Sequence, residues 1–353
     1  MTEKEWQSLY IHKPDDTIRQ MIKERWDNIA KPLDGLGQFE EITARIGAIL
    51  KSEDIDISKK AVIVMCADNG IVEEGISQSG QEVTSSVAIS MAEGTSSICR
   101  MAKIAGTDVI PVDIGINREM SIEGILPRKV AYGTRNFLKA PAMTREEALQ
   151  AMEIGLKLVQ ECKEKGYRIL ATGEMGIGNT TTSAAVSSAL LGCSVRETVG
   201  KGAGLSEEGL RHKTKVIEQA LKTHQLSQED SLGILAAVGG LDIAGLVGVF
   251  IGGALFHIPI VVDGVISAVA ALTAQRMLPG VKEFLIPSHM SREPAAKKVM
   301  EELGLYPVIT ADMALGEGSG AVMMFSLLDI ALSVYKGHTG FQDIGVRAYR
   351  RFL

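Results

Sequence analysis

The sequence contains few aromatic residues and few cysteines. Phe, Trp and Tyr make up 5% of the 353 residues, whereas 46% of the residues are hydrophobic and 37 are glycines. A core of small aliphatic side chains with many tight turns is typical of an α/β protein. No two cysteines form a Cys-x-x-Cys pair, so we expect buried free thiols in a reducing cytoplasm and not disulfides or a zinc site. The four positions are Cys66, Cys99, Cys162 and Cys193.

The sequence also lacks a long basic run and an apolar segment at its start. With a net charge of −6 and no cluster of lysines and arginines, nucleic acid is not an expected partner. The charged residues 1–6 lack the apolar core of a signal peptide, so we predict a cytoplasmic protein. His, Cys, Asp and Glu do not recur at metal-ligand spacing, and neither a metal nor a cofactor is expected.

One stretch, residues 243–262, is long and apolar enough to resemble a membrane span. Glycines and Pro259 interrupt it, and its two halves differ in pattern. Residues 243–256 predict a buried glycine-rich helix, and residues 258–262 predict a central parallel strand, which is apolar on both faces. No membrane span is therefore expected.

A short apolar strand, a glycine-containing turn and a helix recur along the chain. Five strands are predicted, at residues 61–66, 108–113, 168–172, 258–262 and 284–286. Strands that alternate with helices form a mostly parallel sheet flanked by helices. Ligands bind such sheets beyond the carboxyl ends of the strands. The polar residues at these ends are candidate ligand contacts: Asp68, Asn69, Glu174, Asn179, Asp263, Ser288 and His289.

The glycine-rich loop 173–178 follows a predicted strand, and Asn179 is predicted to cap a helix over residues 180–191. Small residues let a ligand approach the backbone, and a helix N-terminus offers free N–H groups to a phosphate. An ordinary tight turn is the alternative. Glu174 favours a ligand site, because a turn does not need a carboxylate there, although Glu174 can also accept N–H bonds near the helix start.

A second glycine-rich loop, residues 200–204, precedes a predicted helix over residues 206–224. Apolar residues at helical spacing form an inward stripe on this helix, and Lys213 lies on the stripe between Leu210 and Ile217. A lysine on an inward face either snorkels to water or meets an anion, and both alternatives stay open here.

A third loop, residues 314–321, places Glu317 among glycines that leave it room. Its apolar neighbours can raise the pKa of the carboxyl above the ordinary value, which suits a general base. A surface glutamate in a flexible loop is the alternative. The loop precedes a long apolar helix that extends to about Tyr335.

The loops together resemble one family, the nicotinate-nucleotide:dimethylbenzimidazole phosphoribosyltransferases, which make the lower-ligand nucleotide of cobamides. The matching segments follow in order through most of residues 30–330. They are residues 65–71 (MCADNGI), 173–181 (GEMGIGNTT), 199–204 (VGKGAG), 238–242 (VGGLD), 262–264 (VDG), 286–289 (IPSH) and 315–321 (LGEGSGA).

The resemblance implies transfer of the phosphoribosyl group of nicotinate mononucleotide to 5,6-dimethylbenzimidazole or a related base. A nitrogen of the base displaces nicotinate from the anomeric carbon with inversion, and Glu317 takes the proton that the base loses. Glu174 lies beside the same site, where a negative charge stabilises an oxocarbenium-like centre. The resemblance also assigns substrate contacts. They are Gly176, Gly202 and Lys213 for the phosphate, Asn179, Thr180, Asp263 and Ser291 for ribose or nicotinate, and Ser79, Met175 and Leu315 for the base, with Gly316 and Gly318 flanking the glutamate.

The resemblance further implies a doubly wound α/β fold and a homodimer. Residues 59–335 are expected to form the large catalytic domain. Residues 1–58 and 336–353 are expected to form a small helical domain with terminal extensions.

Several residues depart from the family pattern. Ala314 stands where an arginine is frequent, Gly80 where proline is common, and Val87 where some members have glutamine. Asp34 and Gly35 stand where Gly-Ser is usual. These departures leave the accepted base open among benzimidazoles, purines and phenols.

Three other classes of protein fit the sequence less well. A nicotinamide-dependent oxidoreductase needs a G-x-G-x-x-G turn after the first strand, and residues 67–70 do not form one. A transferase that uses phosphoribosyl pyrophosphate needs an acidic strand-end motif for Mg²⁺, which is not found. A non-catalytic binding protein would not need both Glu174 and Glu317.

Overall fold

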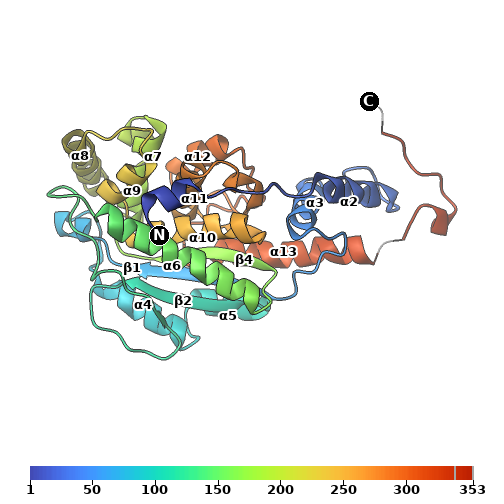
Figure 1. Ribbon diagram of the computed structural model, residues 1–353, viewed down its shortest axis with the longest axis horizontal. Coiled ribbons are helices and arrows are strands. Elements are labelled where there is room, and N and C mark those ends of the chain that lie inside the picture. The colour runs from blue at the N-terminus through green and yellow to red at the C-terminus, as the bar shows by residue number, and fades with distance from the viewer. Residues whose placement is uncertain (338, 352–353) are drawn as a thin grey trace.

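The computed structural model describes residues 1–337 and 339–351 and contains one six-stranded parallel sheet (Figure 1). The order of its strands is β3-β2-β1-β4-β5-β6. Their bounds are β1 (Lys60–Ala67), β2 (Asp108–Gly115), β3 (Leu126–Pro127), β4 (Ile169–Met175), β5 (Ile260–Val262) and β6 (Leu285–Pro287). This is the order of a doubly wound fold, and it places the reversal of strand order between β1 and β4. The predicted fold class is confirmed.

All five predicted strands exist, and the short edge strand β3 was not predicted. The largest difference at the site concerns β4, which continues to Met175 instead of ending at residue 172. Its last residues pair with β1, with Met65 opposite Glu174 and Cys66 opposite Met175. Glu174 therefore belongs to a strand and not to a turn, because the neighbouring strand continues the ladder past Gly173.

Helices cover both faces of the sheet. Their bounds are α1 (Glu3–Gln7), α2 (Asp16–Asn28), α3 (Gln38–Leu50), α4 (Glu82–Ala92), α5 (Ser97–Ile104), α6 (Arg145–Glu164), α7 (Asn179–Leu191), α8 (Glu207–His224), α9 (Ser231–Val238), α10 (Leu241–Phe256), α11 (Val265–Met277), α12 (Ala295–Leu303) and α13 (Ser319–Lys336). Short 3-10 helices are η1 (Gly70–Glu74), η2 (Val195–Glu197), η3 (Val281–Phe284) and η4 (Gln342–Ile344).

Two hydrophobic cores lie on opposite faces of the sheet. In β1, Ile63 and Met65 belong to the core beneath α6 and α10, while Val62 and Val64 belong to the core beneath α5 and α13. Successive side chains of a strand point to opposite faces, so a strand buried on both faces is apolar throughout. All eight residues of β1 are buried, which explains its uninterrupted apolar sequence.

The glycine-rich segment that resembled a membrane span is divided as predicted, into α10 and β5. Its glycines let α10 pack directly on α6. A Cβ atom at Gly248 would lie 1.8 Å from the carbonyl oxygen of Met152, and one at Gly155 would lie 2.0 Å from that of Gly245. Among the described residues, α13 is the helix with the length and hydropathy to cross a membrane, and 56% of it is buried inside the protein.

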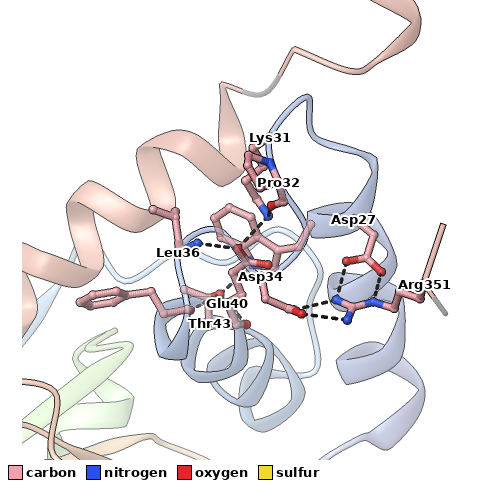
Figure 2. Close-up of polar contacts among 10 residues, drawn as sticks. Asp27, Lys31, Pro32, Asp34, Leu36, Glu40, Thr43 and Arg351 are labelled. Carbon is pink, nitrogen blue, oxygen red and sulfur yellow. Dashed lines mark hydrogen bonds and ion pairs between the residues drawn. The ribbon is translucent and has the colours of Figure 1, made fainter. Parts of the chain in front are cut away.

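The C-terminal segment lies beside α2, whereas the N-terminus lies against α6 (Figure 1). The N–H of Ala30 donates to the carbonyl of Thr339 at 2.9 Å. Arg351 pairs with Asp27 at 2.6 Å and with Asp34 at 2.7 Å (Figure 2). The C-terminal extension thus contacts residues 16–50, whereas α1 contacts α6 through the ion pair of Glu3 with Arg145. The small helical domain and its boundaries at 58/59 and 335/336 stay predictions. Residues 338, 352 and 353 of the predicted extension lie outside the described residues.

The contact with Arg351 gives a reason for one departure from the family pattern. Asp34 replaces a residue that is usually small, and its carboxylate binds an arginine of the C-terminal extension. Asp27, Asp34 and Glu40 each have a carboxylate oxygen within 4.8 Å of the others, the one such group of acidic, histidine or cysteine side chains in the described chain. Arg351 and Lys31 already pair with these three carboxylates (Figure 2).

Candidate active site

A cavity of about 180 Å³ lies beyond the carboxyl ends of β4 and β5. This is the edge at which doubly wound sheets bind ligands. Ten of the residues predicted for the site line this cavity: Glu174, Met175, Gly176, Asn179, Thr180, Gly202, Asp263, Ser291, Leu315 and Gly316. His289, a candidate from its place after β6, also lines it. Four predicted residues are not in the lining, namely Ser79, Lys213, Glu317 and Gly318.

Glu174 is buried at the end of β4, among other acidic side chains. Burial and the charges of Asp242, Asp263 and Glu317 raise its pKa to about 8. The amide of Asn179 donates a hydrogen bond to the carboxylate of Glu174. A carboxyl group with such a pKa is mostly protonated at pH 7, so its charge depends on what binds beside it.

Asn179 does not cap its helix, contrary to the prediction. The N-cap of α7 is Gly178, which has a positive φ of 95°, and Asn179 is the first helical residue. Its side-chain nitrogen instead donates to Glu174 and, at 3.2 Å, to Asp242. Asn179 cannot act as the cap because Gly178 occupies the N-cap position, and its side-chain nitrogen donates to two buried carboxylates.

Asp242 was not assigned a role from the sequence, although it ends one of the motifs that carry the resemblance. It is fully buried in the first turn of α10 and accepts the N–H of Ile243 at 2.9 Å. Burial raises its pKa to about 6. Only the packing of α10 against β4 brings this carboxylate close to Glu174, so no local sequence pattern marks it.

Lys213 is buried and does not snorkel to water, so snorkelling is excluded, while contact with an anion stays a prediction. It is 1% exposed, and its Nζ donates to the Thr180 hydroxyl at 2.9 Å and to the Gly200 carbonyl at 3.2 Å. Burial lowers its pKa to about 8. Lys213 therefore lies directly behind the part of the cavity wall formed by Thr180 and Gly202.

Asp263 holds the loop that carries Glu317. Its carboxylate accepts the N–H groups of Gly318 at 3.2 Å, Gly320 at 2.9 Å and Ala321 at 3.1 Å. These groups belong to the free N-terminus of α13, where a carboxylate is stabilised by the helix dipole. Asp263 also lines the cavity, but its contact with a ribose or nicotinate stays a prediction.

Glu317 is partly exposed and faces the N-terminus of α5. The N–H of Ile98 donates to its carboxylate at 3.3 Å, a contact that the sequence did not indicate. Burial raises the pKa of Glu317, and the hydrogen bond from Ile98 opposes that rise. Glu317 has a φ of 61°, a left-handed conformation that non-glycine residues rarely adopt. Such local strain is frequent at functional sites.

The loop around Glu317 packs so closely on β4 that glycine is required. A Cβ atom at Gly173 would lie 2.6 Å from the carbonyl oxygen of Glu317, and one at Gly316 would lie 2.6 Å from Oε1 of Glu174. The backbone of Glu317 therefore lies against β4, and the carboxylate of Glu174 lies against Gly316 of the same loop. The exposed side chain of Leu315 and the small Ala314 complete this rim of the cavity.

Ser79 lies outside the cavity, in the segment between η1 and α4. Its neighbour Gln78 donates to the carbonyl of Gly204, so this segment contacts the second glycine-rich loop. The predicted contact between Ser79 and the base stays a prediction.

The site is electrically divided into two ends. The carboxyl groups of Glu174, Asp242, Asp263 and Glu317 cluster at the end of β4 and β5, whereas Lys213, the N–H of Gly202 and the single carboxylate of Glu293 lie at the second glycine-rich loop. Asp263 has a basic neighbour, the ring of His289, whose Nδ1 is 3.7 Å away. Such a site fits a substrate that is cationic at one end and anionic at the other.

Comparisons with known proteins identify the family of the chain. A family model described as phosphoribosyltransferase matches residues 11–346. The chain is 47% identical, over 94% of both chains, to the nicotinate-nucleotide–dimethylbenzimidazole phosphoribosyltransferase of Acetivibrio thermocellus. It is 44% identical to that of Clostridium acetobutylicum, covering 96% of this chain and 97% of the relative. The crystal structure of CobT from Thermus thermophilus matches with a TM-score of 0.89 at 37% identity, over 94% of this chain and 100% of that chain. The chain therefore belongs to the nicotinate-nucleotide–dimethylbenzimidazole phosphoribosyltransferase family.

Proposed function

We propose that this enzyme transfers the phosphoribosyl group of nicotinate mononucleotide to 5,6-dimethylbenzimidazole or a related base. The observation that carries the proposal is the divided cavity, with a cluster of carboxyl groups at one end and the ammonium of Lys213, next to the single carboxylate of Glu293, at the other. Nicotinate mononucleotide has the matching form, because its pyridinium ring carries a positive charge and its 5′-phosphate a negative one. The names of the relatives point to the same reaction.

In the proposed reaction, an unprotonated nitrogen of the base attacks the anomeric carbon of the ribose. The bond from that carbon to the pyridinium nitrogen breaks, and its electron pair neutralises the ring as nicotinate leaves. The attached base is then cationic, and Glu317 accepts the proton from its second nitrogen. Glu317 suits this step because its raised pKa brings a carboxylate closer to the pH at which a general base is most effective.

Glu174 contributes charge in this proposal and not proton transfer. With a pKa of about 8 it is mostly protonated at pH 7, and a cationic ring beside it favours the ionised form. The carboxylate then lies next to the carbon on which positive charge develops. Binding of the donor is expected to release a proton.

The direct test is to incubate the protein with nicotinate mononucleotide and 5,6-dimethylbenzimidazole and to separate the products by chromatography. Nicotinate and the α-riboside phosphate should form in equal amounts. A reaction without the base is the control, because release of nicotinate there would indicate hydrolysis. Absence of turnover with benzimidazoles, purines and phenols alike would refute the proposal.

We also propose that the enzyme acts as a homodimer in the cytoplasm. Four free cysteines support a reducing compartment, although only Cys66 and Cys162 are buried as predicted. An apolar stripe on α13 supports self-association. Its exposed members are Met323, Ile330 and Val334, at helical spacing, and Ile330 is 64% exposed. Exposed apolar stripes of this kind are frequent at protein–protein contacts.

A charged residue within the α13 stripe should dissociate the dimer. Ile330→Glu is expected to reduce the mass measured by light scattering from that of two chains to that of one, because a carboxylate cannot be buried there without a partner. Tyr306→Glu is the matched control, since Tyr306 is 73% exposed and lies outside the stripe. A parent protein of one-chain mass would rule out the dimer, and an unchanged Ile330→Glu variant would rule out this surface.

A further inference from the structure

A carboxylate lies at the same end of the cavity as Lys213. Glu293 lines the cavity in the segment between β6 and α12, and its Oε1 accepts the N–H of Gly202 at 3.0 Å. The carboxylate also lies against Gly200, where a Cβ atom would be 2.2 Å from its Oε2. Neither the sequence motifs nor the proposed reaction assigns this residue a role.

The N–H that Glu293 occupies belongs to a small anion-binding arrangement. Gly202 has a positive φ of 52°, and a Cβ atom there would lie 2.8 Å from the Thr180 hydroxyl and 3.6 Å from Nζ of Lys213. Backbone N–H, hydroxyl and ammonium are the donors that a phosphate accepts from. Of these three donors, the Gly202 N–H is the one that a carboxylate of the same chain already holds.

We propose that the carboxylate of Glu293 and the 5′-phosphate of the donor compete for the N–H of Gly202, so that Glu293 sets the affinity of the phosphate site. A phosphate within hydrogen-bond reach of Gly202 lies within a few ångströms of Glu293, and two anions at that separation repel each other. The side chain must rotate away when the phosphate binds. While the nucleotide product is bound, the same carboxylate competes with its phosphate for the N–H of Gly202 and so weakens product binding.

Competition and a purely structural role predict opposite effects of replacing Glu293 on phosphate affinity. If Glu293 only fastened the loop at Gly202, its replacement would loosen the site and weaken phosphate binding. If Glu293 competes, its replacement by a neutral side chain strengthens phosphate binding. The inference rests on the proposed function only for the identity of the bound molecule that carries the phosphate.

The test measures binding of inorganic phosphate by calorimetry, which needs no turnover. Glu293→Gln should lower the Kd for phosphate by about tenfold or more, because one nearby like charge is removed. Glu293→Ala should change it in the same direction. Glu207→Gln is the matched control, since Glu207 pairs with Lys201 of the same loop at its exposed side, and its Kd should stay within about twofold of the parent value.

Two further measurements connect this result to the site and to the reaction. Lys213→Met should weaken phosphate binding by about 100-fold or more, and the KM for nicotinate mononucleotide should fall in Glu293→Gln. The proposal is overturned if both variants at position 293 bind phosphate as weakly as the parent or more weakly, or if Lys213→Met binds it as tightly as the parent. Failure of the proposed transfer reaction would leave the phosphate measurements unaffected, so the two failures are distinguishable.

Discussion

Glu317→Gln should lower kcat by about 100- to 10,000-fold, the range that a positioned general base contributes. The KM for nicotinate mononucleotide should change little, because Glu317 is not in the lining of the cavity that holds the proposed donor site. Steady-state kinetics with both substrates measure the two parameters separately. A loss confined to kcat indicates an interaction made in the transition state and not in the bound substrate.

The pH profile separates a proton acceptor from a residue that only shapes the loop. Because the pKa of Glu317 is raised above its ordinary value of 4.5, kcat of the parent should rise with pH on the acid side and level off once the carboxyl is ionised. Gln cannot titrate, so this limb should disappear in the variant. Nearly normal turnover in Glu317→Gln, or an unchanged acid limb, would remove Glu317 as the base.

The conformation of Glu317 makes glutamine the appropriate replacement. Gln keeps the length of the side chain, the left-handed φ and the ability to accept the N–H of Ile98 through its carbonyl oxygen. Thermal unfolding of the variant should match that of the parent. Glu208→Gln, an exposed glutamate in the first turn of α8, is the control for loss of one negative charge, and its kcat should be unchanged.

Much of this site follows from local sequence patterns. Apolar runs mark the strands, and parallel strands bring their carboxyl ends to one edge, so the meeting of Glu174 and Asp263 is predictable. The apolar helical stripe places Lys213 on the inward face of its helix but does not decide between snorkelling and contact with an anion. The helix after residue 206 begins as expected, with Ser206 as its N-cap.

The other contacts of the site join segments that are distant in the sequence, and local sequence patterns do not encode such contacts. Asp242 reaches Asn179 across 63 residues, and Glu293 reaches Gly202 across 91. The prediction that Asn179 caps its own helix was wrong because Gly178 occupies the N-cap, and the two carboxylates that the Asn179 amide binds are brought near by tertiary packing. The contact between Ile98 and Glu317 spans 219 residues.

Lys213→Met should raise the KM for nicotinate mononucleotide by about 100-fold or more, since loss of a buried charged hydrogen-bond partner costs a few kcal/mol and each 1.4 kcal/mol is tenfold. Met retains the apolar stem, and the fold should persist because the buried ammonium is costly in itself. Its kcat at saturating donor should change much less. Lys215→Met, an exposed lysine two residues along α8, is the matched control and should leave KM unchanged.

Phosphate affinity should depend on pH in the parent protein but not in Lys213→Met. Burial lowers the pKa of Lys213 to about 8, so the ammonium is present below that pH and is lost as the pH rises through it. Affinity of the parent for phosphate should therefore fall above pH 8, and binding below that pH should take up little or no proton at this residue. In Lys213→Met the remaining weak affinity should not vary with pH in this range. A pH-dependent loss of phosphate affinity that persists in the variant would assign the titration to another group.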